Sequence, residues 1–378
     1  MPDPPCKRQQ MDITRPYLLF LGDAVDQLAA KTANGVARWR PDWCVGQMRL
    51  PGCKADVGLP DKNLTEGLAA GARTLVVGVA NRGGVISAQW RQALIAAVDL
   101  GYDIASGLHN RLDEIDELRG AAQAKGSRLI DVRHPTTTFP LGNGRKRTGL
   151  RLLTVGTDVS CGKMFTVLSM EKEMKARGMK ADFRATGQTG IFIAGSGVSV
   201  DAVVSDFVAG AVETLAPENE PDHWDLIEGQ GSLFHASYAG VTLGLIHGSQ
   251  ADRLILCHQP NREHMRGLPG YPLPGLREAI GLNEQTGRLT NPDCRVIGLS
   301  FNTSLLSDAD AQRALREAED ETGLPAIDAY KDGASRLVDL LCAVGRSSSA
   351  LSRRVGRLQA PLPFRVEARQ RRISLSLR

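Results

Sequence analysis

A glycine-bounded loop between an apolar run and a helical pattern holds the residues of this chain with the clearest chemical potential. The apolar run covers residues 152–155, the loop extends from Gly156 to Gly162 and Lys163, and the helical pattern continues to residue 177. In this order of elements, backbone N–H groups and a helix N-terminus converge on a phosphate, and the lysine adds a positive charge. We therefore expect an anion cradle for a phosphate-bearing ligand.

The residue after the Gly-Lys pair is Met164, where a phosphate loop usually has serine or threonine. The hydroxyl at that position normally ligates the Mg²⁺ that bridges nucleotide phosphates. A loop without it predicts a diphosphate-bearing cofactor that binds without a metal, and not necessarily a hydrolysed nucleoside triphosphate. Cys161 lies inside the loop, where a helix N-terminus lowers a thiol's pKa. It is either an acyl-transferring thiol or a buried spacer.

Polar residues also follow several of the expected strands, and ligands of open α/β sheets lie beyond the carboxyl ends of the strands. Arg184, Gln188 and Thr189 can hold a carboxylate, unless residues 184–190 form a turn that binds nothing. Glu228 can hold Mg²⁺ or act as a base, and the alternative is an exposed carboxylate at a turn. Asn302 can read the edge of a nucleobase.

Three further residues are candidates with weaker support from the sequence. His235 lies on a loop, where an imidazole is more often structural than catalytic, but it is close to Glu228 in the sequence. Asp158 lies in the phosphate loop and can hold a metal or a proton. Arg82 follows an expected strand and can pair bidentately with a substrate carboxylate, although its loop can equally seal a domain interface.

Apolar runs alternate with helical patterns along most of the chain, which is typical of βαβ units and parallel sheets. The pattern predicts an α/β protein with two doubly wound parallel-sheet domains. We expect strands at residues 17–21, 43–46, 74–79, 103–105, 128–131, 152–155, 180–184, 225–228, 253–257, 295–301 and near 326. We expect helices at residues 26–38, 87–100, 112–124, 162–177, 200–215, 308–321 and 334–344. An irregular loop is expected at residues 260–275, over the sheet edge.

These elements predict the domain organisation. A disordered leader covers residues 1–15, the first domain 16–135, a linker 136–148, a P-loop domain 149–345, and a basic tail 346–378. The tail holds nine Arg and one Glu, so the chain's net charge of +4 is concentrated there. Prolines interrupt the tail, and we expect a solvated extension rather than a nucleic-acid-binding arm.

Composition indicates a soluble enzyme of the cytoplasm. The 378 residues are 42% hydrophobic and 23% charged, which is ordinary for a globular protein. No apolar run approaches the roughly 20 residues that span a bilayer. The seven cysteines are scattered and form no Cys-x-x-Cys pair, which argues against a disulfide framework or a zinc site. We expect a small-molecule substrate, a homo-oligomer, and neither nucleic acid nor membrane as a partner.

The second half of the chain resembles the dethiobiotin synthetase branch of P-loop proteins. More closely, the whole chain resembles a two-domain bacterial and archaeal family of formerly unknown function, with a Rossmann-like N-terminal domain and a P-loop C-terminal domain. The segments GTDVSCGKMFT, RATGQTGI, EGQGSL and HQPNR carry this resemblance, over roughly residues 15 to 345. A member of that family transfers an acetyl group from acetyl-CoA to D-glutamate in D-amino-acid catabolism.

The resemblance implies a D-amino-acid N-acetyltransferase that uses acetyl-CoA and needs no metal. The resemblance does not assign the base. The amine must lose a proton before it attacks, and the candidates for that base are Glu228, His235 and Asp158. The candidates for contacts of the substrate are Arg82 and Arg184, with Gln188 and Thr189. The expected cofactor site comprises Gly156, Thr157, Asp158, Val159, Ser160, Cys161, Gly162, Lys163, Met164, Phe165 and Asn302. Two alternatives stay open: an ATP- and Mg²⁺-dependent carboxylate ligase or kinase, and a non-catalytic regulator that binds nucleotides or nucleic acid.

Overall fold

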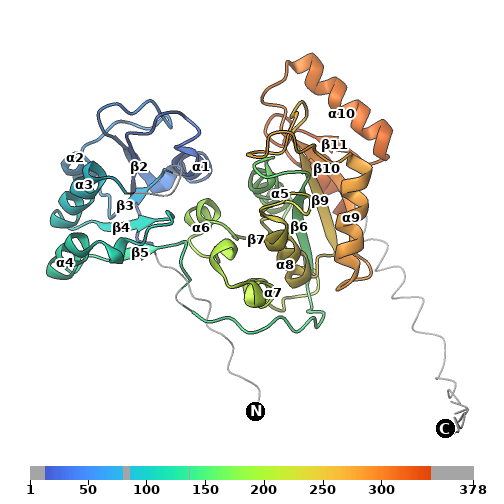
Figure 1. The fold of residues 1–378 in the computed structure, drawn as a ribbon, viewed down its shortest axis with the longest axis horizontal. Helices are drawn as coiled ribbons and strands as arrows, with labels where there is room; N and C mark the ends of the chain where they lie inside the picture. Colours follow the sequence, from blue (N-terminus) through green and yellow to red (C-terminus); the bar gives the residue numbers. More distant parts are fainter. Residues whose placement is uncertain (1–12, 80–85, 136, 342–378) are drawn as a thin grey trace, which may run out of the picture. The chain divides into compact units, whose positions relative to one another are not determined.

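Two parallel sheets organise the chain in the computed structural model, which describes residues 13–79, 86–135 and 137–341 (Figure 1). The first sheet has five strands in the order β2-β1-β3-β4-β5, and every pair is parallel. Its strands are β1 (Tyr17–Gly22), β2 (Cys44–Arg49), β3 (Thr74–Val77), β4 (Asp103–Ser106) and β5 (Leu129–Asp131). The helices of this half are α1 (Lys31–Trp39), α2 (Leu64–Ala69), α3 (Ala88–Asp99) and α4 (Asp116–Lys125).

The second sheet has six parallel strands in the order β11-β10-β9-β6-β8-β7. They are β6 (Leu150–Gly156), β7 (Ala181–Arg184), β8 (Trp224–Ile227), β9 (Arg253–His258), β10 (Arg295–Phe301) and β11 (Ala326–Ile327). The helices are α5 (Lys163–Ala176), α6 (Gln188–Ala194), α7 (Val208–Leu215), α8 (Ala239–Ser249), α9 (Leu276–Arg288) and α10 (Asp308–Thr322). The strand order reverses at β6, because β9, β10 and β11 lie on one side of it and β8 and β7 on the other. The loop after β6 therefore lies at the crevice where such sheets bind ligands.

Both sheets have continuous apolar cores, because parallel strands are covered on both faces. Strands β1, β3, β6 and β9 consist almost entirely of buried residues. The first core includes Leu18, Phe20 and Trp90, and the second includes Leu153 and Leu254. The predicted fold class, two doubly wound parallel-sheet domains, is confirmed.

Several predicted boundaries are wrong for local reasons. The helix expected at residues 26–38 begins at Lys31, because Asp26 Oδ1 accepts a hydrogen bond from Ala29 N (2.8 Å) and closes a turn before it. The helix expected at 200–215 is α-helical only in α7, after two 3₁₀ turns at Val200–Ala202 and Ser205–Phe207. The expected turn at 184–190 contains the start of α6. Helices α2, α8 and α9 were not predicted.

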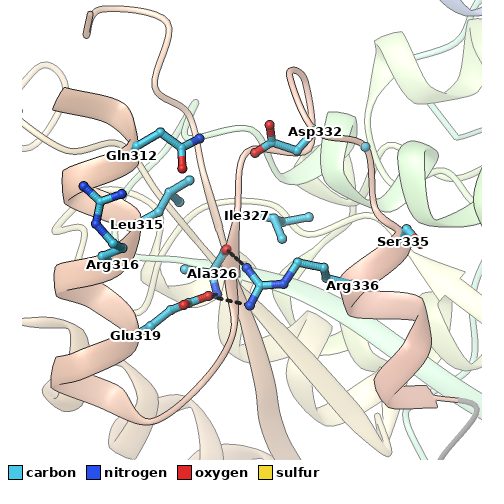
Figure 2. A pocket seen from close by; sticks show the side chains of 10 residues that line it. Gln312, Leu315, Arg316, Glu319, Ala326, Ile327, Asp332, Ser335 and Arg336 are labelled. Atoms are coloured by element: carbon cyan, nitrogen blue, oxygen red, sulfur yellow. Dashed lines mark hydrogen bonds and ion pairs between the residues drawn. The ribbon is translucent and has the colours of Figure 1, made fainter. Parts of the chain in front are cut away.

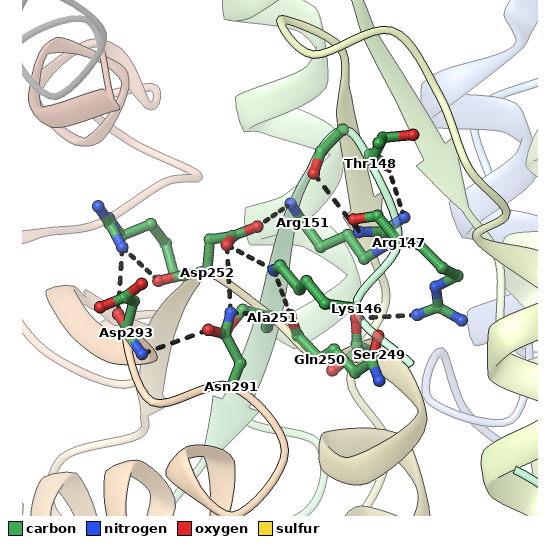
Figure 3. Close-up of polar contacts among 12 residues, drawn as sticks. Lys146, Arg147, Thr148, Arg151, Ser249, Gln250, Ala251, Asp252, Asn291 and Asp293 are labelled. Atoms are coloured by element: carbon green, nitrogen blue, oxygen red, sulfur yellow. Dashed lines mark hydrogen bonds and ion pairs between the residues drawn. The ribbon is translucent and has the colours of Figure 1, made fainter. Parts of the chain in front are cut away.

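Residues 137–148, expected as a linker, contain neither helix nor strand, but they are bound to the second half of the chain. Figure 3 shows the last part of this segment against the loop that precedes β9. Lys146 Nζ lies 2.7 Å from Asp252 Oδ1, and Arg147 donates to the carbonyl of Gly248 (2.7 Å). Arg151, which has no exposed surface, donates to the carbonyls of Arg147 (3.0 Å) and Thr148 (2.9 Å). The segment is therefore fixed by charge-assisted hydrogen bonds.

Contact between this segment and α7 leaves no room for a side chain at Gly210. A Cβ at Gly210 would lie 1.8 Å from the carbonyl oxygen of Pro140. Gly210→Ala should therefore lower the free energy of unfolding by about 1–3 kcal/mol, the usual cost of overpacking. Chemical denaturation monitored by circular dichroism measures this.

The matched control is Gly281→Ala in α9, where a Cβ would meet nothing within 4 Å. That substitution should raise stability by about 0.5–1 kcal/mol through helix propensity. Equal effects of the two substitutions would contradict the packing of residues 137–148 on α7.

Candidate active site

The loop between β6 and α5 has the backbone geometry of an anion cradle. Ser160 (φ +53°) and Gly162 (φ +104°) have left-handed conformations, and Gly162 caps the N-terminus of α5. The first N–H groups of a helix have no partner within it and carry its positive dipole end. A Cβ at Gly156 would lie 2.7 Å from Cys161 Sγ and 3.0 Å from Lys163 Nζ, so only glycine lets the loop close this tightly.

Lys163 folds back over this loop. Its Nζ donates to the carbonyl of Asp158 (2.8 Å) and lies 3.6 Å from Cys161 Sγ, and the side chain is 7% exposed. Cys161 is itself 1% exposed, and its thiol donates to the same carbonyl (3.1 Å). This packing agrees with a spacer role for Cys161 and holds the ammonium group of Lys163 above the cradle.

The carboxylate of Asp158 has no exposed surface and is surrounded by donors. Its Oδ1 accepts from Val159 N (2.6 Å), and its Oδ2 accepts from Arg266 N (2.9 Å) and from the guanidinium of Arg262. Arg262 also donates to the carbonyl of Val159 (2.8 Å). Residues 260–275 contain neither helix nor strand, so the prediction of an irregular loop is confirmed. Through Arg262 and Arg266 this loop binds Asp158 of the phosphate loop.

Glu228, at the end of β8, is buried and faces the loop between β7 and α6. Its Oε2 accepts from the backbone N–H groups of Thr186 (2.9 Å) and Gly187 (3.2 Å). Burial raises the pKa of Glu228 to about 7, and these N–H groups, Gln230 and the charge of Lys163 oppose that rise. A carboxylate that titrates near neutral pH suits general base catalysis.

Glycines make the approach of Glu228 to the phosphate loop possible. A Cβ at Gly229 would lie 1.6 Å from the Thr154 carbonyl oxygen and 3.1 Å from Lys163 Cδ. A Cβ at Gly190 would lie 2.3 Å from Glu228 Oε2. The ends of β6, β7 and β8 therefore meet closely around Glu228 and Lys163.

His235, the second candidate base, uses both ring nitrogens within the protein. Its Nε2 donates to the carbonyl of Arg266 (3.1 Å), and its Nδ1 accepts from Ser237 N (3.2 Å). The ring is 2% exposed and lies against Tyr238, with centroids 4.6 Å apart. Its Nε2 is 4.0 Å from Asp158 Oδ1, so the three candidate bases share one region but differ in the bonds they already make.

Some of the remaining predicted cofactor residues lie at the phosphate loop, and others lie beside it. Thr157 Oγ1 hydrogen-bonds His258 Nδ1 (2.9 Å), and burial lowers the pKa of His258 to about 4. Asn302 lies beside the loop, because a Cβ at Gly162 would be 3.9 Å from Asn302 Cβ.

Phe165 and Met164 instead contact α1. The Phe165 ring lies 5.1 Å from the rings of both Trp39 and Tyr330, and a Cβ at Gly35 would lie 3.7 Å from Met164 Cε.

Not all of the predicted substrate residues lie in the site. The Arg184 guanidinium is paired with the buried carboxylate of Asp225, with Nε 2.7 Å and Nη2 2.6 Å from Oδ1. Thr189 Oγ1 lies 3.1 Å from Thr32 Oγ1. The Gln188 amide fills the space beside Gly107, where a Cβ would be 2.1 Å from Oε1. Arg82 lies outside the described residues.

Sequence reasoning missed Arg262 and Arg266, which reach Asp158 from 104 and 108 residues further along the chain. Arg262 belongs to the motif HQPNR, which indicates a functional segment, but no rule of sequence spacing predicts which carboxylate its side chain contacts.

A separate pocket lies at the other edge of the second sheet (Figure 2). Its volume is about 320 Å³, and α10, β11 and residues 332–336 line it. Arg336 crosses it, donating to the carbonyl of Ala326 (3.1 Å) and lying 2.8 Å from Glu319 Oε1. None of the predicted site residues lines this pocket.

In the described part of the chain, no cluster of three or more His, Cys, Asp or Glu is arranged to hold a metal ion. Within the same residues, no helix is long and apolar enough to cross a membrane.

Fold and loop together define a two-domain α/β protein with a P-loop. The model of a domain of unknown function described as a P-loop domain, DUF1611_C, matches residues 140–338. That of a Rossmann-like domain, DUF1611_N, matches residues 48–135. The chain belongs to the DUF1611 family.

Similar proteins include two named enzymes and one solved structure. D-glutamate N-acetyltransferase of Tritonibacter scottomollicae is 56% identical over 332 residues, which are 88% of this chain and 100% of the relative. The enzyme of that name from a Pseudoalteromonas species is 48% identical over the same shares. The crystal structure of a DUF1611 family protein from Anabaena variabilis is 32% identical with a TM-score of 0.79, and the match covers 86% of this chain and 98% of that one.

The raised pKa of Glu228 predicts a pH-dependent stability. Its pKa in the folded protein, about 7, exceeds the ordinary value of 4.5, so folding favours the protonated form. In wild type, the contribution of Glu228 to the free energy of unfolding is fully present below pH 4.5 and is lost as the pH rises through about 7. The glutamine of Glu228→Gln does not ionise, so the variant does not lose this contribution at high pH. The melting temperature of the variant minus that of wild type should therefore be larger at pH 8 than at pH 5.

Differential scanning calorimetry at both pH values measures the effect, and Glu321→Gln on the exposed surface is the control. A Glu228→Gln difference that does not change with pH would contradict a buried carboxyl at this position.

Proposed function

We propose that this protein is a D-glutamate N-acetyltransferase that takes its acetyl group from acetyl-CoA. Two relatives of that name, aligned over their full length, support the reaction. The structural observation that carries the proposal is the juxtaposition of an anion cradle with a buried carboxylate that titrates near pH 7. The first can hold a phosphorylated acyl donor, and the second can deprotonate an amine.

The residues around the loop fit the diphosphate of coenzyme A. The N–H groups at the start of α5 and the ammonium group of Lys163 supply donors and positive charge for phosphate oxygens. Met164 provides no hydroxyl for a magnesium ion, which agrees with a diphosphate that undergoes no chemistry. Asn302 lies beside Gly162, and we propose that it contacts the base of the donor. Acetyl-CoA itself supplies the activated thioester.

We assign the role of general base to Glu228 among the three candidates. An amine must lose a proton before it attacks an acyl group, and the acceptor must be unprotonated near neutral pH. Asp158 is already saturated by Arg262, Arg266 N and Val159 N. His235 uses both ring nitrogens on the backbone. We propose that these two residues position the loops.

We also propose a role in D-amino-acid catabolism in the cytoplasm, as a homo-oligomer, with no nucleic-acid or membrane partner. The five cysteines of the described residues are free thiols, which suits a reducing compartment. Light scattering of the full chain tests the oligomeric state.

Glu228→Gln should lower kcat for acetylation of D-glutamate by a factor of about 100 or more, the usual contribution of a general base. In wild type, kcat/KM should rise with pH through about 7, because the deprotonated carboxylate is the active form. The variant should lose that limb of the profile. Release of coenzyme A, followed with a thiol reagent between pH 5.5 and 9, measures both. A variant with the wild-type profile would show that Glu228 is not the base.

Lys163→Ala should weaken the binding of coenzyme A roughly 10- to 100-fold, because one charge-assisted hydrogen bond contributes about 1.5–3 kcal/mol. Isothermal titration calorimetry in the presence of EDTA measures the dissociation constant. Lys172→Ala, an exposed lysine of the same helix, is the control and should bind like wild type. Unchanged affinity of the Lys163 variant, or binding that appears only with ATP and Mg²⁺, would favour a ligase or kinase instead.

A further inference from the structure

Three basic side chains outside the predicted site come from segments far apart in the sequence. Lys31 is the first residue of α1, Arg133 follows β5, and Arg266 lies in the irregular loop before α9. None of them belongs to the phosphate loop or to the predicted substrate contacts.

Hydrogen bonds and an ion pair bring all three segments to the region of α6 and Asp158. Thr32, the neighbour of Lys31, hydrogen-bonds Thr189 in the first turn of α6 (3.1 Å). Arg133 pairs with the carboxylate of Asp201, which follows α6 in the chain. Arg266 is fixed by its backbone, since its N–H donates to Asp158 (2.9 Å) and its carbonyl accepts from His235 (3.1 Å). The backbone of Arg266 is thus rigid while its side chain is exposed.

The charges of these side chains act on each other. The side chain of Lys31 is exposed at its surface, like that of Arg266. The pKa of Lys31 is nevertheless lowered, first by partial desolvation and then by repulsion from Arg266 and Arg133. No carboxylate contributes to that shift, and within the described residues neither Lys31 nor Arg266 makes an ion pair through its side chain. Asp201 offsets Arg133, so the group carries an excess of two positive charges. Like charges held together are unfavourable unless an anion joins them.

We propose that Lys31, Arg133 and Arg266 form the clamp for the two carboxylates of the amino-acid acceptor. This inference rests on the proposed function, because it places the acceptor next to the cradle that holds the acyl donor. An acidic amino acid with its amine deprotonated has a charge of −2, which matches the excess of the group. The clamp also takes the role that Arg184, held by Asp225, does not fill.

The position of the clamp places the acceptor near the base. Arg266 N shares Asp158 with the phosphate loop, and α6 follows directly on Gly187, whose N–H donates to Glu228 (3.2 Å). An amino acid whose carboxylates bind Lys31 and Arg266 therefore lies beside the carboxyl ends of β6 to β8. Specificity for an acidic side chain follows from the second carboxylate, since an apolar side chain leaves the cations unpaired.

The test uses Lys31→Met and Arg266→Met in the full chain, with Lys172→Met as the control on an exposed face. Each clamp variant should raise KM for D-glutamate about 10-fold or more while KM for acetyl-CoA stays within 2-fold, because one charge-assisted contact is lost. The preference for D-glutamate over D-2-aminopentanoate, which lacks the side-chain carboxylate, should fall by a similar factor. Calorimetric titration of D-glutamate into the protein without donor gives a readout that is independent of turnover.

The outcomes separate the clamp from the proposed function. Wild-type acetylation of D-glutamate with unchanged D-glutamate affinity in both variants overturns the clamp and leaves the transferase intact. Weaker coenzyme A binding in the variants also overturns it, because the cations would then serve a phosphate of the donor. Weaker D-glutamate binding in folded variants, judged by an unchanged melting temperature, supports the clamp even if acetyl transfer is not observed. Wild type that neither binds nor acetylates D-glutamate overturns both proposals.

Discussion

The buried carboxylate of Asp158 is the interaction on which the rest of the site depends. It has no exposed surface, and its charge is balanced by Arg262 and by the N–H groups of Val159 and Arg266. Loss of Arg262 would leave the buried charge of Asp158 uncompensated, which strongly destabilises a protein. The contacts of Asp158 therefore depend on one another. They determine the shape of the phosphate loop and bring residues 260–275 to it.

Two consequences for the chemistry follow from that arrangement. The carbonyl of Asp158 holds Lys163 over the cradle (2.8 Å), and the backbone of Arg266, which has an exposed side chain, is fixed on Asp158 and His235. Glu228 approaches the same loop because Gly229 leaves no side chain between β8 and β6. In the proposed reaction, the binding of a phosphorylated donor, the positioning of an acidic acceptor and the removal of a proton would all involve this one small set of loops.

The strands and the phosphate loop could be predicted because their signals are local. Apolar runs such as residues 295–301 coincide with β10, and the Gly-Lys pair marks the start of α5. Helix boundaries were less predictable. Asp26 accepts a hydrogen bond from Ala29 N and forms a turn before α1, and the first residues of α6, which include Gly and Thr, resemble a turn in sequence.

Side-chain partners depend on tertiary contacts that no pattern encodes. Arg184 was expected to grip a substrate because it ends a strand, but its guanidinium is paired with Asp225 on the neighbouring strand. No local pattern links Lys31 and Arg266, because they are 235 positions apart and have no motif in common. The sequence predicts Asp158 as a base or a metal ligand, but two of its donors, Arg262 and the N–H of Arg266, come from residues 260–275, more than 100 positions further along the chain.

A crystal structure of the protein with coenzyme A, grown in EDTA, would show whether the phosphate loop binds the donor. We expect the diphosphate inside the loop from Gly156 to Lys163, within hydrogen-bond distance of Lys163 Nζ and of N–H groups at the start of α5, with no metal ion between them. Coenzyme A bound elsewhere, with this loop empty, would contradict this expectation.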